Sequence, residues 1–355
     1  MILVNDFIDY GTNNNTKPCT RQRILVVDGT NVLFRVTNVI NMVNASQDHL
    51  KKYEKDILEL TDDDQEIVFE DEDYLVFKRN VFKGFLNMVL KHKTLHKCDK
   101  VYVCFDMGKS WRALYTTNEL EGMTPLTHKV YKGKRRLDMT LREQIEYKMM
   151  KLVGNEIATF IHGHTNIKCF HNPILEADDF MGQLPQHCPE HDFIVLSTDG
   201  DMTQLLRFSN VQVYDLHNKR MREECDVDWF LFEKCIRGDK SDNVRSAFPG
   251  VRTTRLKKAY EDPFEHTNIM ETVWVDKEDK TKSYTVKDIY AENQMLMDLT
   301  KQPEHIKAML TELIAMELMR ESNTCNKFSL GKSLLQYQLD HLHDDLMKNK
   351  LNWLC

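Results

Sequence analysis

The sequence predicts an α/β fold in which helices flank a mostly parallel central sheet. Three short apolar runs, at residues 24–27, 101–105 and 193–196, are rich in β-branched residues and too short for helices. Such runs are typical of strands that are buried on both faces. The stretches between them contain amphipathic helical patterns, and this alternation of strands and helices favours a parallel sheet.

Each of the three predicted strands is closely followed by aspartate. Asp28 ends the first strand, Asp106 follows the second, and Asp199 and Asp201 follow the third. One aspartate after a strand can simply cap the next helix. Because the carboxyl ends of parallel strands meet at one edge of the sheet, however, the repetition indicates a shared carboxylate cluster at that edge.

Composition limits the class of protein. The chain has 355 residues, enough for one large domain or two, and a formal net charge of −7, which still allows a local basic groove. Nine scattered cysteines without a CxxC pair are typical of a reducing compartment. Polar residues interrupt the short apolar start, and no apolar run is as long as a membrane span. We therefore expect a cytoplasmic monomer with no membrane contact.

The predicted organisation is a loose leader at 1–23, a core at 24–237 and a helical region at 238–355. The core contains an insertion at 44–73, whose last thirteen residues hold eight acidic and no basic side chains, as a solvated or disordered loop would. Apolar periodicity predicts the main helices. They lie at 30–43, 74–97, 139–161, 229–236, 291–299, 305–319 and 334–347. Further strands are expected at 165–170 and 211–214.

Residues 107–148 form a basic segment, with nine Lys and Arg against five Asp and Glu. Trp111, Tyr115 and Tyr131 are interleaved with these charges. Basic side chains contact phosphates and aromatic rings can stack on unpaired bases, so the segment is predicted to contact nucleic acid. Gly122 and Pro125 favour a bent segment over one continuous helix.

The candidate carboxylates form one set. They are Asp28, Asp106, Glu176, Asp178, Asp179, Asp199, Asp201, Asp239 and Asp242. So many acids at one edge require cations, and an all-oxygen ligand set favours Mg²⁺ or Mn²⁺ over Zn²⁺. Two such ions about 4 Å apart form the usual centre for attack of water on a phosphodiester.

In this order the motifs resemble the 5′-nuclease superfamily. That superfamily includes flap endonucleases, the 5′→3′ exonuclease domain of bacterial DNA polymerase I and the ribonuclease H of T-even phages. The matching stretches are Val-Asp-Gly-Thr-Asn at 27–31, Phe-Asp at 105–106, Tyr-Lys-Gly-Lys-Arg at 131–135, Glu-Ala-Asp-Asp at 176–179, Thr-Asp-Gly-Asp at 198–201 and Gly-Asp-Lys-Ser-Asp-Asn-Val at 238–244. The last two are most similar to the phage ribonuclease H.

The resemblance implies a PIN-like core with a helical arch and a helix-hairpin-helix-like element near 238–260. It implies two Mg²⁺ ions, for which Mn²⁺ can substitute. Asp28, Asp106, Glu176 and Asp178 would surround the first ion. Asp179, Asp199, Asp201, Asp239 and Asp242 would lie toward the second.

The resemblance also assigns basic residues. Lys132 and Arg135 match catalytic residues at the base of the arch, and Arg35 matches a basic residue on the first helix. Nucleic-acid contact is predicted for these three and for Lys129, Lys134, Arg136, Arg252, Arg255 and Lys257. In the hairpin at 248–252, Arg252 stands where the family has a second glycine. This puts the K⁺ site of that hairpin in doubt, because glycine allows close backbone approach to phosphate.

The function that these features predict is a Mg²⁺-dependent, structure-specific 5′→3′ nuclease that removes RNA primers or 5′ flaps. Its substrates would be DNA and RNA–DNA hybrids with 5′ ends or flaps. Residues 333–337 could be a docking tail for a sliding clamp or a single-strand-binding protein, although core packing is the simpler interpretation. The alternatives are a PIN-type ribonuclease, which would lack the arch, and a catalytically inactive nucleic-acid-binding scaffold.

Overall fold

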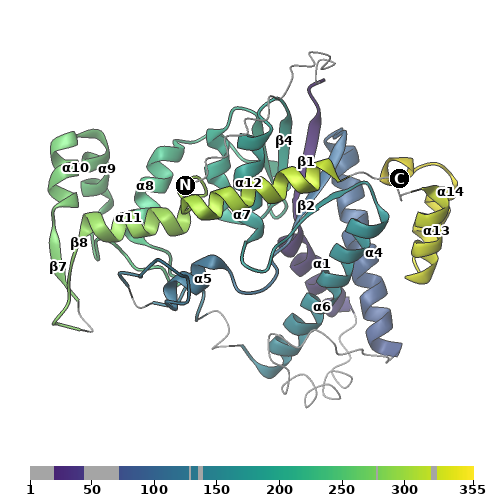
Figure 1. Cartoon of the computed structure of the whole chain (residues 1–355), viewed down its shortest axis with the longest axis horizontal. Coiled ribbons are helices and arrows are strands. Elements are labelled where there is room, and N and C mark those ends of the chain that lie inside the picture. The colour runs from purple at the N-terminus through teal and green to yellow at the C-terminus, as the bar shows by residue number, and fades with distance from the viewer. Residues whose placement is uncertain (1–19, 44–71, 128, 135–138, 277–278, 321–325) are drawn as a thin grey trace, which may run out of the picture.

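The computed structural model describes residues 20–43, 72–127, 129–134, 139–276, 279–320 and 326–355 (Figure 1). Its centre is a six-stranded sheet of order β3-β2-β1-β4-β5-β6. The strands are β1 (Arg23–Asp28), β2 (Lys100–Cys104), β3 (Lys168–Phe170), β4 (Asp192–Ser197), β5 (Val211–Asp215) and β6 (Arg220–Met221). All neighbours pair in parallel except β5 and β6, so the predicted mostly parallel sheet is confirmed.

The central strand β1 is flanked by the two strands that precede the other aspartates. Val27 lies opposite Val103 of β2 and Leu196 of β4. This register brings the carboxyl ends of β1, β2 and β4 side by side. Strand β3 is shorter than predicted, because Thr165 instead caps the preceding helix.

Helices cover both faces of the sheet, as the doubly buried strands require. One face carries α1 (Gly29–Val43), α4 (Glu72–Leu95) and α6 (Leu141–His164), and the other carries α7 (Ala177–His187) and α12 (Glu304–Met319). Successive β1 side chains point alternately to the two faces. Leu25 and Val27 pack with the first group of helices, whereas Ile24 and Val26 pack with the second.

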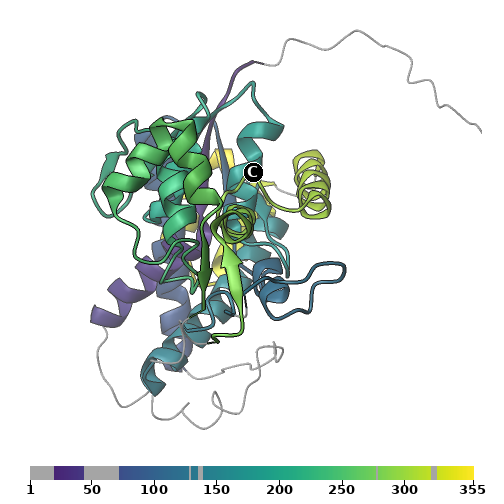
Figure 2. The same ribbon diagram turned by 90° about the vertical axis from the view of Figure 1, so that its left-hand side faces the viewer.

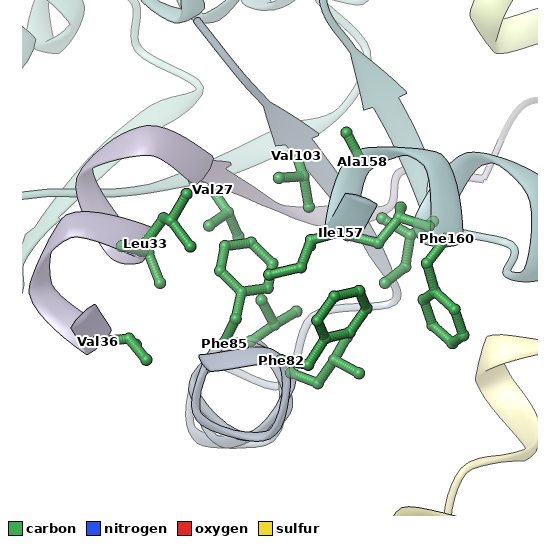
Figure 3. Packing of buried hydrophobic residues seen from close by; sticks show 14 of the residues in the cluster. Val27, Leu33, Val36, Phe82, Phe85, Val103, Ile157, Ala158 and Phe160 are labelled. Carbon is green, nitrogen blue, oxygen red and sulfur yellow. The ribbon is translucent and has the colours of Figure 1, made fainter. Parts of the chain in front are cut away.

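Aromatic side chains fill the face under α4. Figure 3 shows Phe82 and Phe85 of α4 pointing toward the sheet between α1 and α6. Phe85 stacks on Phe105 with 5.7 Å between ring centroids, and Phe82 meets Phe160 edge-on at 5.8 Å. Because Phe105 directly precedes Asp106, this packing also fixes the end of β2.

A third cluster lies at one end of the molecule, where α9 and α10 stand beside the hairpin β7–β8 (Figure 1). Its elements are α8 (Val227–Arg237), α9 (Thr253–Glu261), α10 (Pro263–Met270), β7 (Val273–Val275), β8 (Ser283–Thr285) and α11 (Val286–Met297). Figure 2 looks along the long axis and shows α9 and α10, in green, on the opposite side from the blue segment around residues 111–130. The hairpin β7–β8 was not expected in a region predicted to be helical.

The C-terminal segment folds back onto the core. Residues 334–347 were expected to form one helix, but the structure has two, α13 (Lys327–Gln336) and α14 (Asp340–Met347). Gln338 lies between them with a φ of 55°, which a helix cannot continue through. Both helices pack on the α4–α6 face, and Leu334 in the candidate docking tail is 1% exposed. This burial favours the core-packing interpretation of residues 333–337.

We expect Leu334→Ala to lower the free energy of unfolding by about 2–4 kcal/mol, because it removes a buried side chain and leaves a cavity. Leu335→Ala is the matched control, since the neighbouring side chain is 46% exposed and should cost less than about 0.5 kcal/mol. Urea denaturation of the two variants measures this difference. Equal losses would mean that α13 does not pack as described.

Two further regions bear on the predictions. The acidic insertion lies almost entirely outside the described residues, since only Glu72 and Asp73 at its end are described. Among the described helices, none combines the length and apolar character needed to cross a membrane.

Candidate active site

The carboxylate at the end of β1 is held by its neighbours. Asp28 accepts hydrogen bonds from the Asn31 backbone N–H at 3.0 Å and from the Ser197 hydroxyl of β4 at 2.7 Å. Gly29 allows this close approach of β1 and β2, because a Cβ there would lie 2.8 Å from the Cys104 carbonyl oxygen. Asp28 is therefore fixed between the ends of its two neighbouring strands.

Asp106 connects β2 to two helix N-termini. Its backbone N–H donates to the Thr30 hydroxyl at the start of α1, at 2.9 Å. Its carboxylate accepts from the backbone N–H of Ala177, the first residue of α7, at 2.8 Å. Asp106 thus lies between Asp28 and the acidic start of α7.

Asp178 and Asp199 complete a group of four carboxylates that affect one another. Burial, and next the charge of Asp106, raise the pKa of Asp28 to about 7. Burial, followed by the charges of Asp199, Asp28 and Asp106, raises the pKa of Asp178 well above its ordinary value. The structure therefore brings together the acids from β1, β2, β4 and α7 that the sequence predicted to meet.

Glu176, the N-cap of α7, lies between two cations. Arg112 donates to one of its oxygens at 2.8 Å, and Lys132 pairs with the other. The Lys132 side chain is 28% exposed, whereas that of Arg112 is only 2% exposed. Glu176 therefore connects the buried interior to the base of the basic segment.

Asp179 has a different environment from its neighbours. It is completely buried, and Arg112 donates to both of its oxygens at 3.0 and 2.7 Å. Trp111, Gln302 and the Glu176 backbone N–H also donate to it. Burial alone would raise the pKa of Asp179, but the charge and hydrogen bonds of Arg112, together with the hydrogen bonds from Glu176 and Gln302, outweigh burial and lower it. These contacts argue against its predicted place beside a metal ion and give it a structural role.

Asp201 and Asp239 share a lysine that the sequence analysis did not single out. Lys234 of α8 pairs with Asp201, at the start of the 3₁₀ helix η1 (Gly200–Arg207), and contacts Asp239 at 3.0 Å. Burial, together with the charges of Asp199 and Asp242, raises the pKa of Asp201 in spite of Lys234. The pKa of Asp239 is instead lowered, because hydrogen bonds from Ser241 and Lys234 and the charge of Lys234 outweigh burial. One lysine therefore does not neutralise this half of the cluster.

The donor set fits a hard divalent cation, because it consists of carboxylate oxygens whose charges repel one another. Within the ranges that the structure describes, no three Asp, Glu, His or Cys side chains are yet arranged to hold an ion together. Glu176, Asp201 and Asp239 instead form ion pairs with Arg112, Lys132 and Lys234. Binding an ion would require these carboxylates to exchange protein partners for it.

The basic segment is anchored to the loop after α8. Tyr131 donates its hydroxyl to Asp242 at 2.9 Å, the Lys132 N–H donates to the Asp242 carbonyl at 2.8 Å, and Asn243 donates to the Val130 carbonyl at 2.9 Å. These contacts place Lys132 beside Glu176 and Asp242. Sequence reasoning gave no sign that this loop would hold the base of the segment.

Three aromatic residues predicted to stack on bases are instead part of the core. Trp111, Tyr115 and Tyr131 are 0%, 4% and 7% exposed and pack between α7 and α11. Arg112, counted among the basic residues facing nucleic acid, is also buried and lies with Trp111 and Tyr115 in α5 (Trp111–Thr116). The sequence pattern was misread because interleaved charged and aromatic residues also occur in a short helix whose charged side chain forms a buried ion pair.

The other predicted nucleic-acid contacts differ in exposure. Lys134 is exposed and Lys129 half-buried, while Arg135 and Arg136 lie outside the described residues. Arg252, Arg255 and Lys257 are exposed on or next to α9, and Arg35 is half-buried on α1. In the hairpin, Gly250 has a φ of 78°, whereas Arg252 is an ordinary extended N-cap. No second positive-φ residue is therefore needed at position 252.

Arg222 is a further residue that the sequence analysis missed. It follows β6 and donates to the carbonyls of Asp199 at 2.6 Å and Gly200 at 3.2 Å, and to the Thr203 hydroxyl at 2.9 Å. It thus holds the turn that carries Asp199 and Asp201. No local motif marks Arg222, because its role depends on the return of the β5–β6 hairpin to that turn.

Comparison with known proteins adds independent findings. A family model described as 5′-3′ exonuclease, N-terminal resolvase-like domain, matches residues 23–233. Ribonuclease H of Enterobacteria phage T4 is 30% identical over an alignment of 149 residues, and the match covers 37% of this chain and 45% of that protein. The chain therefore matches less than half of the length of this curated relative.

Solved structures with the same fold include the T5 D15 protein co-crystallised with metal ions. It has a TM-score of 0.54 at 17% identity, with 83% of this chain and 100% of that chain covered. A T5 flap endonuclease variant, in a pseudo-enzyme–product complex with DNA and metal ions, has a TM-score of 0.53 at 16% identity, with 84% and 100% covered. At these identities the likeness concerns the fold.

Proposed function

Because the chain belongs to the family of 5′-3′ exonucleases with a resolvase-like N-terminal domain, we propose that it is a Mg²⁺-dependent nuclease acting on 5′ ends. It hydrolyses phosphodiester bonds with two metal ions and removes RNA primers or 5′ flaps during replication. The names of its relatives, a ribonuclease H and a flap endonuclease, support this substrate class.

One observation carries the proposal. Four carboxylates from three parallel strands and a helix N-terminus converge, and their burial, together with their mutual repulsion, raises the pKa of Asp28 and Asp178. A protein that only binds nucleic acid would gain nothing from uncompensated negative charge near phosphates. Such a cluster is useful only when it holds cations, and those ions would supply an activated water and stabilise charge on the reacting phosphate.

The chain's own residues hold and orient the substrate in this proposal. Lys132 lies beside the cluster, where its ammonium group can stabilise charge on the scissile phosphate once Glu176 takes another partner. The exposed side chains of Arg252, Arg255 and Lys257 on and beside α9 can contact duplex phosphates. Predicted contacts of Arg35, Lys129, Lys134, Arg135 and Arg136 belong to the same proposal.

The test uses a 5′-labelled flap and a 5′-labelled RNA–DNA hybrid, each with wild type and Asp199→Asn, in Mg²⁺ and in EDTA. Wild type should release short 5′ products in Mg²⁺ only. Asp199→Asn should lower the rate by about a hundredfold or more, because it removes a charge at the reacting centre. The fold should be retained, since the asparagine oxygen can still accept from the Asp201 N–H, as Asp199 does at 2.9 Å.

Asp228→Asn is the matched control, because it removes a carboxylate that is 81% exposed on α8. It should cleave like wild type. Product lengths would distinguish flap cutting from stepwise trimming. If wild type binds both substrates and cuts neither, the nuclease proposal is wrong and the scaffold alternative takes its place.

A further inference from the structure

The two halves of the carboxylate cluster differ in their protein cations. Among the residues that the structure describes, no Lys or Arg forms an ion pair with Asp28, Asp106, Asp178 or Asp199. Asp201 and Asp239, by contrast, are bridged by the single ammonium group of Lys234. These four carboxylates therefore lack a direct counter-charge, whereas Glu176 beside them pairs with Arg112 and Lys132, and Asp201 and Asp239 share Lys234.

The position of Lys234 is fixed by the fold. Its helix, α8, is anchored by the buried side chains of Cys235 and Ile236. Gly238 ends the helix with a φ of 69°, and a Cβ there would lie 2.5 Å from the Arg245 backbone. The chain therefore turns sharply and brings Asp239 back to Lys234, five residues earlier.

The partners of Asp239 are equally well defined. One of its oxygens accepts from the Ser241 N–H at 2.7 Å, the Ser241 hydroxyl at 2.6 Å and the Asp242 N–H at 3.2 Å. The other oxygen accepts from Lys234 at 3.0 Å. The Lys234 side chain is only 13% exposed, so its charge is little screened by solvent. A divalent ion approaching these two carboxylates would meet a like charge already between them.

We propose that Lys234 is a built-in cation that competes with the second metal ion for Asp201 and Asp239. The protein would then hold one divalent ion tightly and take up the second only weakly. This inference rests on the proposed function, because it assumes that these carboxylates serve as metal ligands. Lys234 is accordingly a positioning residue that acts through the two aspartates.

The test measures Mn²⁺ binding to the full-length protein without nucleic acid, by titration calorimetry and by the electron paramagnetic resonance of free Mn²⁺. Wild type should show one tight and one weak site. Lys234→Met should bind the second ion on the order of tenfold more tightly, because a like charge next to the site is removed. Lys234→Arg keeps the charge and should retain the weak second site.

Lys307→Met is the control for loss of a lysine, since Lys307 forms a comparable 3.0 Å ion pair with Glu304 on α12. It should bind Mn²⁺ like wild type. Thermal unfolding in EDTA and in Mn²⁺ checks the fold, and Lys234→Met should gain more in Tm from Mn²⁺ than wild type does. If the methionine variant does not fold in EDTA, Lys234→Gln, which can still donate hydrogen bonds, is measured in the same way.

The outcomes separate this inference from the proposed function. If wild type binds Mn²⁺ and cleaves, but the uncharged Lys234 variants bind the second ion no more tightly, the competing role of Lys234 is refuted and the nuclease proposal stands. If wild type neither binds Mn²⁺ nor cleaves, the proposed function fails, and this inference fails with it.

Discussion

Replacement of Arg112 by methionine is expected to lower the free energy of unfolding by about 3–5 kcal/mol. Arg112 is 2% exposed and donates to Glu176, to both oxygens of Asp179 and to the Leu296 carbonyl. Methionine fills a similar volume but leaves the Asp179 carboxylate buried without its cation. A buried charge that loses its partner costs far more than an exposed one.

Lys109→Met tests this reasoning from the same segment of chain. Lys109 pairs with Glu119 at 2.7 Å, the same distance as the Arg112–Asp179 pair, but both side chains are about half exposed. Exposed pairs contribute little, so we expect no measurable change. Urea denaturation of both variants in EDTA gives the comparison. Similar losses for both would show that burial does not determine the contribution of Arg112.

Arg112→Lys separates charge from shape. A lysine keeps the positive charge but cannot donate in the forked geometry that reaches Glu176 and Asp179 together. We therefore expect it to be less stable than wild type. Because Glu176 would lose its fixed orientation, the variant should also need more Mg²⁺ for cleavage, which makes Arg112 a positioning residue.

Local patterns were sufficient to predict strands β1, β2 and β4 and the acids that follow them. Asp28, Asp106 and Asp199 could be placed at one edge because a parallel sheet brings together the carboxyl ends of strands far apart in sequence. The prediction that this edge binds divalent cations came from residue type. These parts of the site depend on the backbone, which short-range sequence signals describe well.

The remaining parts depend on contacts between distant side chains. Nothing near Arg112 reveals that Asp179 will meet it in the interior, and nothing near Lys234 reveals that Asp201 lies beside it. Acids at the start of a helix look alike in sequence, yet Asp178 remains in the cluster while Asp179 pairs with Arg112. Only tertiary packing distinguishes the two neighbours.

Asp28→Asn is expected to make the metal-free protein more stable while abolishing cleavage. The carboxylate of Asp28 is 5% exposed, and burial together with Asp106 raises its pKa to about 7 from an ordinary value near 4. The folded state therefore disfavours the ionised form. Asparagine has the same shape, and its oxygen can still accept from the Asn31 N–H.

The gain in stability should depend on pH in a defined direction. Because the pKa of Asp28 is raised in the folded state, the contribution of its protonated form to stability is fully present below the unfolded pKa near 4. This contribution is lost as the pH rises through about 7. In EDTA the variant should therefore match wild type near pH 4 and exceed it by on the order of 2 kcal/mol at pH 8. His92, whose pKa burial lowers to about 4, is present in both proteins and cancels in the difference.

Mg²⁺ should reverse the order of stability at pH 8, because an ion bound to the native state stabilises it and removes the repulsion on Asp28. Wild type should gain more in Tm than Asp28→Asn, and Asp228→Asn should behave like wild type throughout. The measurement is thermal unfolding between pH 4 and 8 in EDTA and in Mg²⁺. A variant that is less stable than wild type at every pH in EDTA would show that Asp28 is stabilised by its hydrogen bonds. Repulsion among the carboxylates of the cluster would then not destabilise the metal-free protein.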